Sequence, residues 1–302
     1  YDQAILLEPG HASVRWNRST VLLMLGRLKE GWEAFEWRRS AGHWQALPFP
    51  EWQGEALQDK TLLVLAEQGL GDEILFGSCL PELIKLSKHC IIECDTRLGD
   101  LYRTSFPEAT IKAVVRQQRD WLKDLSSVDV CIPLGSISRF LRKNLTDFPN
   151  IPAYLSPPED ELHYWGEQLK RLSPKIKVGI CWRSQISREG RHLNYSRLDQ
   201  WQDIFALDNV QFINLQYDEC QAELNAVQEK FQVTVHQFKG IDLKNDLNAV
   251  AAICAELDVV ISAGTALAEI AAAVGTPVFR LEPIETGWIS LGTHYLPWNP
   301  QV

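Results

Sequence analysis

The sequence predicts an α/β protein in which two doubly wound domains follow a short helical segment. Apolar residues recur at helical spacing over about the first 45 residues. After them, short β-rich runs alternate with helical stretches, which is typical of βαβ units and parallel sheets. Residues 150–161 are rich in proline and acidic residues, and they separate four β-rich runs from the five that follow. We therefore expect a helical segment over 1–47, a first sheet domain over 48–155 and a second over 156–302.

Length and charge limit the classes of function. A chain of 302 residues is long enough for two domains. Its net charge of −9 disfavours nucleic-acid or anionic-membrane partners, which would repel it. No stretch reaches the roughly 20 apolar residues of a transmembrane segment, and no signal peptide is visible. Seven cysteines without a CxxC pair fit a reducing compartment, so we expect a cytoplasmic location.

The helical segment begins with "YDQAILLEP", which ends at a proline, as helices commonly do. Two further helical stretches are joined at Gly26. This pattern resembles a tetratricopeptide repeat, although an ordinary helical hairpin would produce it too. Such repeats need about three copies to bury their faces, so we expect further repeats before Tyr1. A linker over 43–60, with two prolines, leads to the first sheet.

Nine β-rich runs are the expected strands. Four precede the boundary: "TLLVLA", "CIIEC", "IKAVV" and "DVCIPL". Five follow it: "KVGICW", "VQFINL", "QVTVH", "DVVIS" and "TPVFRL". His89, Cys90 and Cys94 could ligate a metal, but a buried strand of small hydrophobic residues explains them better. We therefore predict no metal site.

Ligands of open α/β sheets bind at the carboxyl ends of the strands, so the loops there are the candidate sites. The first loop, "AEQGLGD", contains four candidate acceptor-site residues, Glu67, Gln68, Gly69 and Gly71. Its glycines allow a tight turn and a close approach to a ligand. Asp72 lies at the start of the next helix, where it could cap that helix or act as a general base. Ile74 replaces the third glycine of a dinucleotide fingerprint, which disfavours nicotinamide binding.

The second loop, "RSQISREGRHLNYSRLDQW", is basic in an otherwise acidic chain. Its cationic or titratable residues are Arg183, Arg188, Arg191, His192 and Arg197. Because arginine makes bidentate contacts with phosphates, the loop favours phosphate binding over a merely solvated surface.

The third loop lies in "DVVISAGTALAEIAAAVGTPVFRL". Gly264 and Thr265 open an alanine-rich helix whose free N–H groups suit a phosphate. Glu269, one turn into that helix, could reach a ribose or sugar hydroxyl. The structural alternative is a helix packed through its alanines with an exposed Glu269.

Together these loops resemble the heptosyltransferase-like glycosyltransferases, in particular the group with tetratricopeptide repeats fused before a GT-B unit. The most specific match is "P-x-W-x-G-E-x-L-x-x-K-T-L-L-V-L-A-E-Q-G-L-G-D", from Pro50 to Asp72. "VGICW", "FINLQ", "LDVVISAGTALAEIAAAVGTPV" and "LPWNP" follow in the expected order. The resemblance covers nearly the whole chain. It implies a GT-B fold of two Rossmann-like domains, preceded by tetratricopeptide-like helices.

The resemblance also implies a function. The implied reaction transfers a sugar from a nucleotide-sugar with inversion of the anomeric centre and without a metal ion. The nucleotide is unknown, and no cofactor other than this co-substrate is implied. Asp72 would be the base for the acceptor. The donor site would comprise Arg183, Arg191, Gln216, Tyr217, Gly264, Thr265 and Glu269. Gln216 and Tyr217 would lie near the nucleoside, and the arginines with Gly264 and Thr265 would bind the diphosphate. We expect the acceptor to be a protein bound by the helical repeats, or a surface glycan, since solenoids present concave binding surfaces.

This chain departs from the resembled pattern at its third loop. Many relatives carry Asp and His where this chain has Gly264 and Glu269, and Ser-Ile where it has Asn194-Tyr195. A sugar other than heptose, or a weakened site, would accommodate the change. The alternative function is a catalytically silent GT-B scaffold whose repeats recruit a protein partner. A sugar-nucleotide epimerase of GT-B shape is less favoured, because it would give the repeat helices no purpose.

Overall fold

The computed structural model describes residues 1–42, 46–115, 118, 120–125, 127–185, 194–283 and 287–299. The chain forms two compact units. The first comprises Tyr1–Gly99, Phe106–Ile151 and Glu285–Pro300, and the second comprises Asp100–Ser105, Pro152–Ile284 and Gln301–Val302. The helical segment thus belongs to the same compact unit as the first sheet, and the domain boundaries expected from the sequence stay a prediction.

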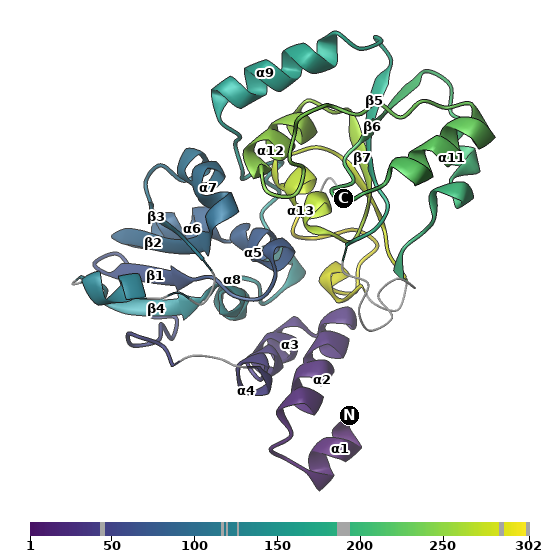
Figure 1. Ribbon diagram of the computed structural model, residues 1–302. Helices are drawn as coiled ribbons and strands as arrows, with labels where there is room; N and C mark the ends of the chain where they lie inside the picture. Colours follow the sequence, from purple (N-terminus) through teal and green to yellow (C-terminus); the bar gives the residue numbers. More distant parts are fainter. Residues whose placement is uncertain are drawn as a thin grey trace. The chain divides into compact units, whose positions relative to one another are not determined.

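The first unit contains a four-stranded parallel sheet with strand order β3-β2-β1-β4 (Figure 1). Its helices are α1 (Asp2–Leu7), α2 (Ala12–Met24), α3 (Leu28–Phe35), α4 (Arg38–Ala41), α5 (Leu70–Gly77), α6 (Leu80–Leu86) and α8 (Ser138–Leu141). Its strands are β1 (Thr61–Leu65), β2 (His89–Asp95), β3 (Thr110–Val114) and β4 (Val130–Pro133). Helix α7 (Gly99–Ser105) belongs largely to the second unit. These strands confirm the four runs predicted before the boundary.

The linker protects the outer edge of β4. The amide of Cys131 donates to the carbonyl of Pro50 (2.8 Å), and the amide of Trp52 donates back to the carbonyl of Cys131 (2.9 Å). An edge strand otherwise presents unpaired backbone groups that invite association, and these two bonds remove part of that edge. The linker is therefore a structural part of the first unit.

An aromatic cluster anchors the helical segment within the first unit. Trp32 on α3, only 1% exposed, packs edge-on against Phe76 of α5 and Trp298 of the C-terminal segment, with ring centroids 6.4 and 5.8 Å away. Its indole Nε1 donates to the carbonyl of Arg142 (2.8 Å). Gly26 adopts φ +70° between α2 and α3, which confirms the predicted helix break. The structure shows a helical hairpin here, and its assignment to the tetratricopeptide family stays a prediction.

The second unit repeats the parallel architecture with strand order β6-β5-β7-β8. Its strands are β5 (Ile176–Cys181), β6 (Val210–Asn214), β7 (Val259–Ala263) and β8 (Val278–Leu281). Its helices beyond α7 are α9 (Glu159–Lys170), α10 (Gln202–Phe205), α11 (Gln221–Phe231), α12 (Leu247–Ala255) and α13 (Ala266–Ala273). Four of the five runs predicted after the boundary are therefore strands.

The fifth predicted strand, "QVTVH", is wrong as a strand. Its first residue, Gln232, adopts a left-handed conformation with φ 57° and ends α11. Only His236 then reaches the sheet, as an isolated parallel bridge to Ile213. The first residue of this run caps α11, and the β-branched residues after it lie outside both helix and strand.

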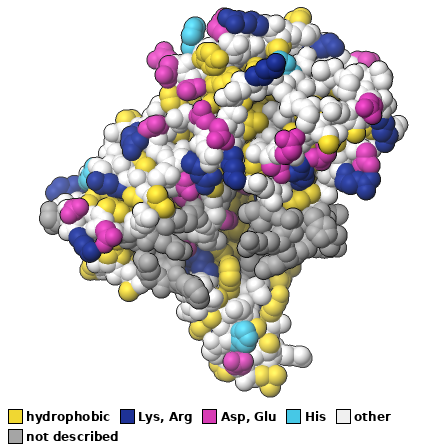
Figure 2. All heavy atoms as spheres, viewed as in Figure 1, with side chains coloured by type: hydrophobic (Ala, Val, Ile, Leu, Met, Phe, Trp, Pro, Cys, Tyr) yellow, Lys and Arg dark blue, Asp and Glu magenta, His cyan; other side chains and the backbone are white. Residues whose placement is uncertain are grey.

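Within the described ranges, no helix has the length and apolar character needed to cross a membrane. Figure 2 shows acidic and basic side chains interspersed over the visible face. The most exposed large apolar side chains belong to α1, where Leu6 and Leu7 are 81% and 88% exposed.

Candidate functional site

In the first unit, the loop between β1 and α5 is the candidate acceptor site. Gly69 is the N-cap of α5 and Asp72 is its third residue, so Gly71 lies inside the first turn. Asp72 Oδ2 accepts a hydrogen bond from the Gly69 amide (2.9 Å), which is the contact that the third helical residue makes in a capping box. Asp72 is half-buried. Asp72 therefore supports the helix start as its third residue rather than as the N-cap, and a role as base would have to coexist with this contact.

Glu67 is part of a buried ionic network rather than an exposed ligand. Its carboxylate accepts two hydrogen bonds from Arg38, at 2.5 and 2.9 Å, and a third from the amide of Gly135 (2.6 Å). Arg38 also donates to Ser136 (2.8 Å) and Glu36 (2.9 Å). Burial would lower the pKa of Arg38, but the attraction of Glu67 and Glu36 outweighs it and raises that pKa, so the guanidinium stays charged. A ligand can reach Glu67 only by displacing this network.

Gln68 holds the backbone conformation that the turn needs. Its φ is 60°, in the left-handed region that non-glycine residues adopt at a cost. Its side-chain Nε2 is buried and donates to no acceptor among the described residues. An N–H group in this state is available to an oxygen of a ligand.

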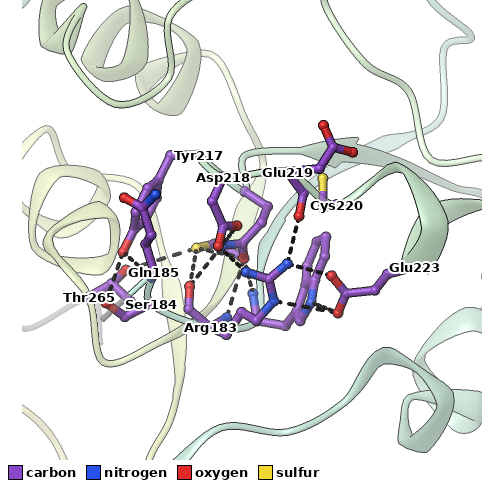
Figure 3. Close-up of polar contacts among 12 residues, drawn as sticks. Arg183, Ser184, Gln185, Tyr217, Asp218, Glu219, Cys220, Glu223 and Thr265 are labelled. Carbon is purple, nitrogen blue, oxygen red and sulfur yellow. Dashed lines mark hydrogen bonds and ion pairs between the residues drawn. The ribbon is translucent and has the colours of Figure 1, made fainter. Parts of the chain in front are cut away.

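In the second unit, Gln216 links the ends of β5 and β6, next to the polar contacts of Arg183 and Tyr217 that Figure 3 draws. Its Oε1 accepts from the amides of Trp182 (3.1 Å) and Arg183 (3.3 Å), and its Nε2 donates to the carbonyl of Arg183 (2.9 Å) and to Asp218 (2.8 Å). Gln216 is 2% exposed. These bonds use both ends of its amide, so the role that the structure shows for Gln216 is to shape the loop.

Arg183 is bound by acidic side chains on two sides. It forms ion pairs with Asp218 and with Glu223 (2.5 Å), and it donates to the carbonyl of Glu219 (2.9 Å). Burial would lower the pKa of Arg183, but hydrogen bonds and attraction from the two carboxylates raise it. The carboxylates of Asp218 and Glu223 therefore balance the charge of Arg183 in the absence of a bound phosphate.

Tyr217 fixes the start of the basic loop. Its hydroxyl donates to Ser184 (3.1 Å) and accepts from the amide of Gln185 (3.3 Å). Lys244 reaches the side chain of Gln185 as well (2.6 Å). Of the predicted phosphate ligands, Arg188, Arg191 and His192 lie outside the described residues.

A cavity of about 420 Å³ opens at the carboxyl end of β6. Its wall includes Gln216, Tyr217, Phe238, Ile241 and Asp242. Aromatic and aliphatic surface beside amide and carboxylate groups suits a small polar ring system. The structure thus brings Gln216 and Tyr217, predicted to lie near a nucleoside, to the wall of one cavity.

Thr265 opens α13 beside the end of β5. It is the N-cap of that helix and lies 4.0 Å, Oγ1 to Sγ, from Cys181. Burial raises the pKa of the Cys181 thiol to about 12, so this cysteine stays neutral near pH 7. The backbone N–H groups at this helix start lie at the carboxyl edge of the sheet, as predicted.

Glu269 is not the exposed carboxylate of the structural alternative. It is 5% exposed and pairs with Arg280 on β8. Arg280 also binds Glu282 (2.5 Å), the first residue after β8. A Cβ on Gly264 would collide with the carboxylate of Glu282. Glycine is therefore required at 264 while Glu282 keeps this position.

Sequence reasoning missed Arg38, Asp218, Glu223, Arg280 and Glu282. Glu282 is the first residue after β8, and Asp218 lies four residues beyond the end of β6, so the rule that sites lie at carboxyl ends could have found them. Arg38 comes from the helical segment and has no local signal. The network it forms with Glu67 depends on tertiary packing alone.

Known proteins resemble the chain in sequence and in fold. No family model matches it. Protein FlbA of Caulobacter vibrioides is 34% identical over 319 aligned positions, which include 99% of this chain. The alignment takes in 53% of FlbA, so the chain spans about half the length of this relative.

Two solved structures share the fold. A glycosyl transferase family 9 protein from Veillonella parvula superposes with a TM-score of 0.62, at 14% identity, over 82% of this chain and 86% of its own. The ADP-heptose lps heptosyltransferase II of E. coli superposes with a TM-score of 0.52, at 14% identity, over 73% of this chain and 84% of its own. With two parallel four-stranded sheets, the chain therefore has the two-domain GT-B fold of these proteins.

Proposed function

We propose that the chain is a glycosyltransferase that moves a sugar from a nucleotide-sugar to a polypeptide, with inversion and without a metal ion. The observation that carries this proposal is the fold match with a glycosyl transferase family 9 protein over 82% of the chain. Polar loops at the carboxyl ends of both sheets support it, because ligands of open α/β sheets bind there. A surface glycan is the alternative acceptor.

In this proposal Asp72 is the general base. It takes the proton of the acceptor hydroxyl while the acceptor oxygen forms a bond to the anomeric carbon of the sugar. The bond from that carbon to the phosphate oxygen breaks, and the nucleotide leaves with the bonding electrons. The buried N–H of Gln68 is positioned in the same loop to orient an incoming oxygen. A single displacement of this kind inverts the anomeric centre.

The donor would bind in the second unit. The nucleoside fits the cavity beside Gln216 and Tyr217, and the diphosphate fits the N-terminus of α13 at Gly264 and Thr265. Arg183 and Arg191 complete the proposed diphosphate site. Glu269, bound by Arg280, would contribute by fixing the helix end rather than by touching a sugar hydroxyl.

A groove in the helical segment is the proposed docking place of the polypeptide acceptor. It has a volume of about 700 Å³ between α1, α2 and α3, with Ala34 and Trp37 in its wall. Arg15 lies over the Trp37 ring, and Lys29 at the rim is exposed. Because the wall carries the acids Asp2, Glu30 and Glu33 as well as the cations Arg15, Arg18 and Lys29, the groove suits a polypeptide segment of mixed charge with an apolar side chain.

One observation favours the alternative of a catalytically silent scaffold. Arg183 and Arg280, two of the described arginines at the proposed donor loops, are each bound by two carboxylates. A diphosphate would therefore meet little uncompensated positive charge from them. In this alternative no nucleotide binds, and the helical segment recruits a protein partner.

A thermal-shift panel with UDP, GDP, ADP, CMP and their sugars tests the proposal. A ligand at 100 times its dissociation constant adds about 2.7 kcal/mol to the free energy of unfolding, so a true donor raises the melting temperature by several degrees. Stabilisation by one nucleotide family supports transfer, and no stabilisation across the panel supports the scaffold. Incubation with the donor alone then separates an epimerase, which would convert the sugar nucleotide without any acceptor.

A further inference from the structure

The ion pair between Arg38 and Glu67 lies where the first sheet would receive a ligand. In the strand order β3-β2-β1-β4, the chain passes from β1 to β2 and β3 on one side and then crosses to β4 on the other side of β1. Ligands of such open sheets bind at the point between β1 and β4 where the strand order reverses. Glu67 follows β1, and Gly135 follows β4. Their contact therefore joins the loops that follow β1 and β4, and Arg38 binds the same carboxylate from the helical segment.

The side chains of Arg38 and Glu67 are tightly packed, and Gly135 lies directly against them. The side chains of Arg38 and Glu67 are each 3% exposed. A Cβ on Gly135 would lie 2.6 Å from Glu67 Oε1 and 3.2 Å from Gln68 Nε2, so no other residue fits without displacing them. The bidentate pair fixes the Glu67 carboxylate in direction as well as in position.

The loop beyond Glu67 needs such a constraint. Gln68, the next residue, is held at φ 60°, a conformation that persists only when its surroundings enforce it. The amide before the loop, on Ala66, is bound by Glu93 (3.0 Å), and the amide of Gly69 is bound by Asp72 (2.9 Å). Glu67 holds the middle of this short segment.

Stability alone is a weak explanation for the pair. Replacing a buried ion pair by packed apolar residues is often neutral or stabilising, because desolvation offsets the Coulomb attraction. What charged and directional partners add is a defined geometry. Here that geometry belongs to the loop that presents Asp72.

We propose that Arg38 is a positioning residue for sugar transfer, which fixes the loop from Gln68 to Asp72 through Glu67. The inference rests on the proposed role of Asp72 as base. It makes the helical segment a part of the transfer site as well as a candidate docking surface. Removal of that segment would leave Glu67 buried without its cation, so acceptor docking and loop geometry cannot be separated by deletion.

Hydrogen–deuterium exchange at peptide resolution tests the proposal without any substrate. Arg38→Met and Glu67→Gln should raise exchange over residues 66–76 by about tenfold or more, while β2 stays protected. Arg38→Lys, which keeps the charge but loses the bidentate fork, should give a smaller rise. If Arg38→Met fails to fold, the exchange is measured in Arg38→Lys instead.

Arg142→Met is the matched control. Arg142 has a side chain 1% exposed and one ion pair, with Glu82 (2.8 Å), and none of its described polar contacts reaches residues 66–72. Its loss should lower the unfolding midpoint but leave the local exchange over 66–76 unchanged. If the Arg38 variants and Arg142→Met raise exchange evenly over the first unit, the ion pair merely stabilises the fold and the proposal is wrong.

Kinetics supply the second readout. With the donor found by the nucleotide panel, Arg38→Lys should lower kcat by about 100-fold, since misplacement of a reacting group by 1 Å has that effect. The KM for the donor should stay within about twofold, because the donor loops belong to the other unit. An unchanged kcat would contradict the proposal. A chain that binds no nucleotide would overturn the proposed function, while the exchange result would still decide whether Arg38 fixes the loop.

Discussion

The carboxylate of Glu282 occupies the space in which a side chain on Gly264 would begin. Arg280 holds it there from β8, and the same guanidinium binds Glu269 on α13. A carboxylate from the end of the neighbouring strand therefore fills the space beside Gly264.

Gly264→Ala should therefore destabilise the second unit. The new methyl group must displace the Glu282 carboxylate, and overpacking of this kind costs about 1–3 kcal/mol. Adding Glu282→Ala should recover most of the loss, because it removes the atom with which the methyl group collides. Urea unfolding of the two single variants and the double variant measures the coupling energy.

Gly10→Ala is the control for a general effect of replacing glycine. A Cβ at Gly10 would meet no atom within 4 Å, and its φ lies outside the left-handed region. Its unfolding midpoint should match that of the unchanged chain within about 0.5 kcal/mol. Additive effects of Gly264→Ala and Glu282→Ala would mean that the two positions do not compete for space.

The strands were predictable because a parallel sheet buries both of its faces, and its strands then appear as continuous apolar runs. All five residues of β1 are buried, and its sequence "TLLVL" has no polar residue beyond Thr61. The failure at 232–236 has a local cause. Gln232 takes the left-handed conformation that ends α11, and no periodicity in the run reports this.

The location of the candidate site was more predictable than its chemistry. The carboxyl-end rule identified the loops of Asp72, Arg183 and Thr265 because strand direction determines where ligands bind. It could not show that Arg183 is paired with acids or that Arg38 reaches Glu67. Such pairs join residues 29 or more positions apart and leave no spacing to detect.

Arg183 and Glu223 give opposite predictions for nucleotide binding. Arg183→Ala should weaken the binding of the nucleotide that wins the panel by about 10–100-fold, the value of a hydrogen bond to a charged group. Glu223→Gln should strengthen it, because it frees part of the guanidinium charge and keeps the oxygen that accepts from Trp182. Isothermal calorimetry measures both affinities.

Arg97→Ala is the matched control for these two variants. Arg97 is also an arginine paired with an acid, Asp95 (2.9 Å), but it belongs to the first unit. Its loss should leave the affinity unchanged. Equal nucleotide affinity in Arg183→Ala and Arg97→Ala would mean that the diphosphate binds elsewhere. A loss of nucleotide affinity in Glu223→Gln would mean that Arg183 has a structural role.

Asp72→Asn should separate the proposed catalytic role of Asp72 from its role at the start of α5. The amide oxygen of Asn can still accept from Gly69, so the helix start is retained while the basicity is lost. Loss of a general base typically lowers the rate by about 10²–10⁴-fold. Single-turnover transfer measures the effect, with the circular dichroism spectrum and the melting temperature as controls for folding. Unchanged turnover would leave Asp72 with its structural role alone.

Trp32→Ala should unfold the first unit at much lower urea concentration. The variant removes the ring that joins α3 to Phe76 and Trp298, and loss of a buried tryptophan costs about 3–5 kcal/mol. Trp32→Phe should cost less, since it mainly loses the hydrogen bond to the Arg142 carbonyl. Tyr295→Ala, at a residue 52% exposed, should be nearly neutral. A cost below 1 kcal/mol for Trp32→Ala would show that the helical segment is not anchored by this ring.

The network at Arg38 also predicts how stability depends on pH. Burial alone would raise the pKa of Glu36, but the attraction and hydrogen bond of Arg38, with the hydroxyl of Ser136 (3.0 Å), bring it below its ordinary value of 4.5. The unfolded chain therefore binds more protons than the folded chain as the pH falls through this range. The stability that Glu36 contributes is present above about pH 4.5 and is lost as the pH falls toward the folded-state pKa.

Glu36→Gln isolates this contribution, because a neutral amide cannot titrate. Urea unfolding between about pH 6 and pH 3 should give a shallower dependence of the unfolding free energy on pH in this variant than in the unchanged chain. Added salt should flatten the contribution of exposed pairs such as Arg27 and Glu30 far more than that of Glu36, because buried charges are screened less. Parallel pH curves for the two proteins would mean that Glu36 titrates as it does in the unfolded chain, and that the charge of Arg38 is balanced by Glu67 alone.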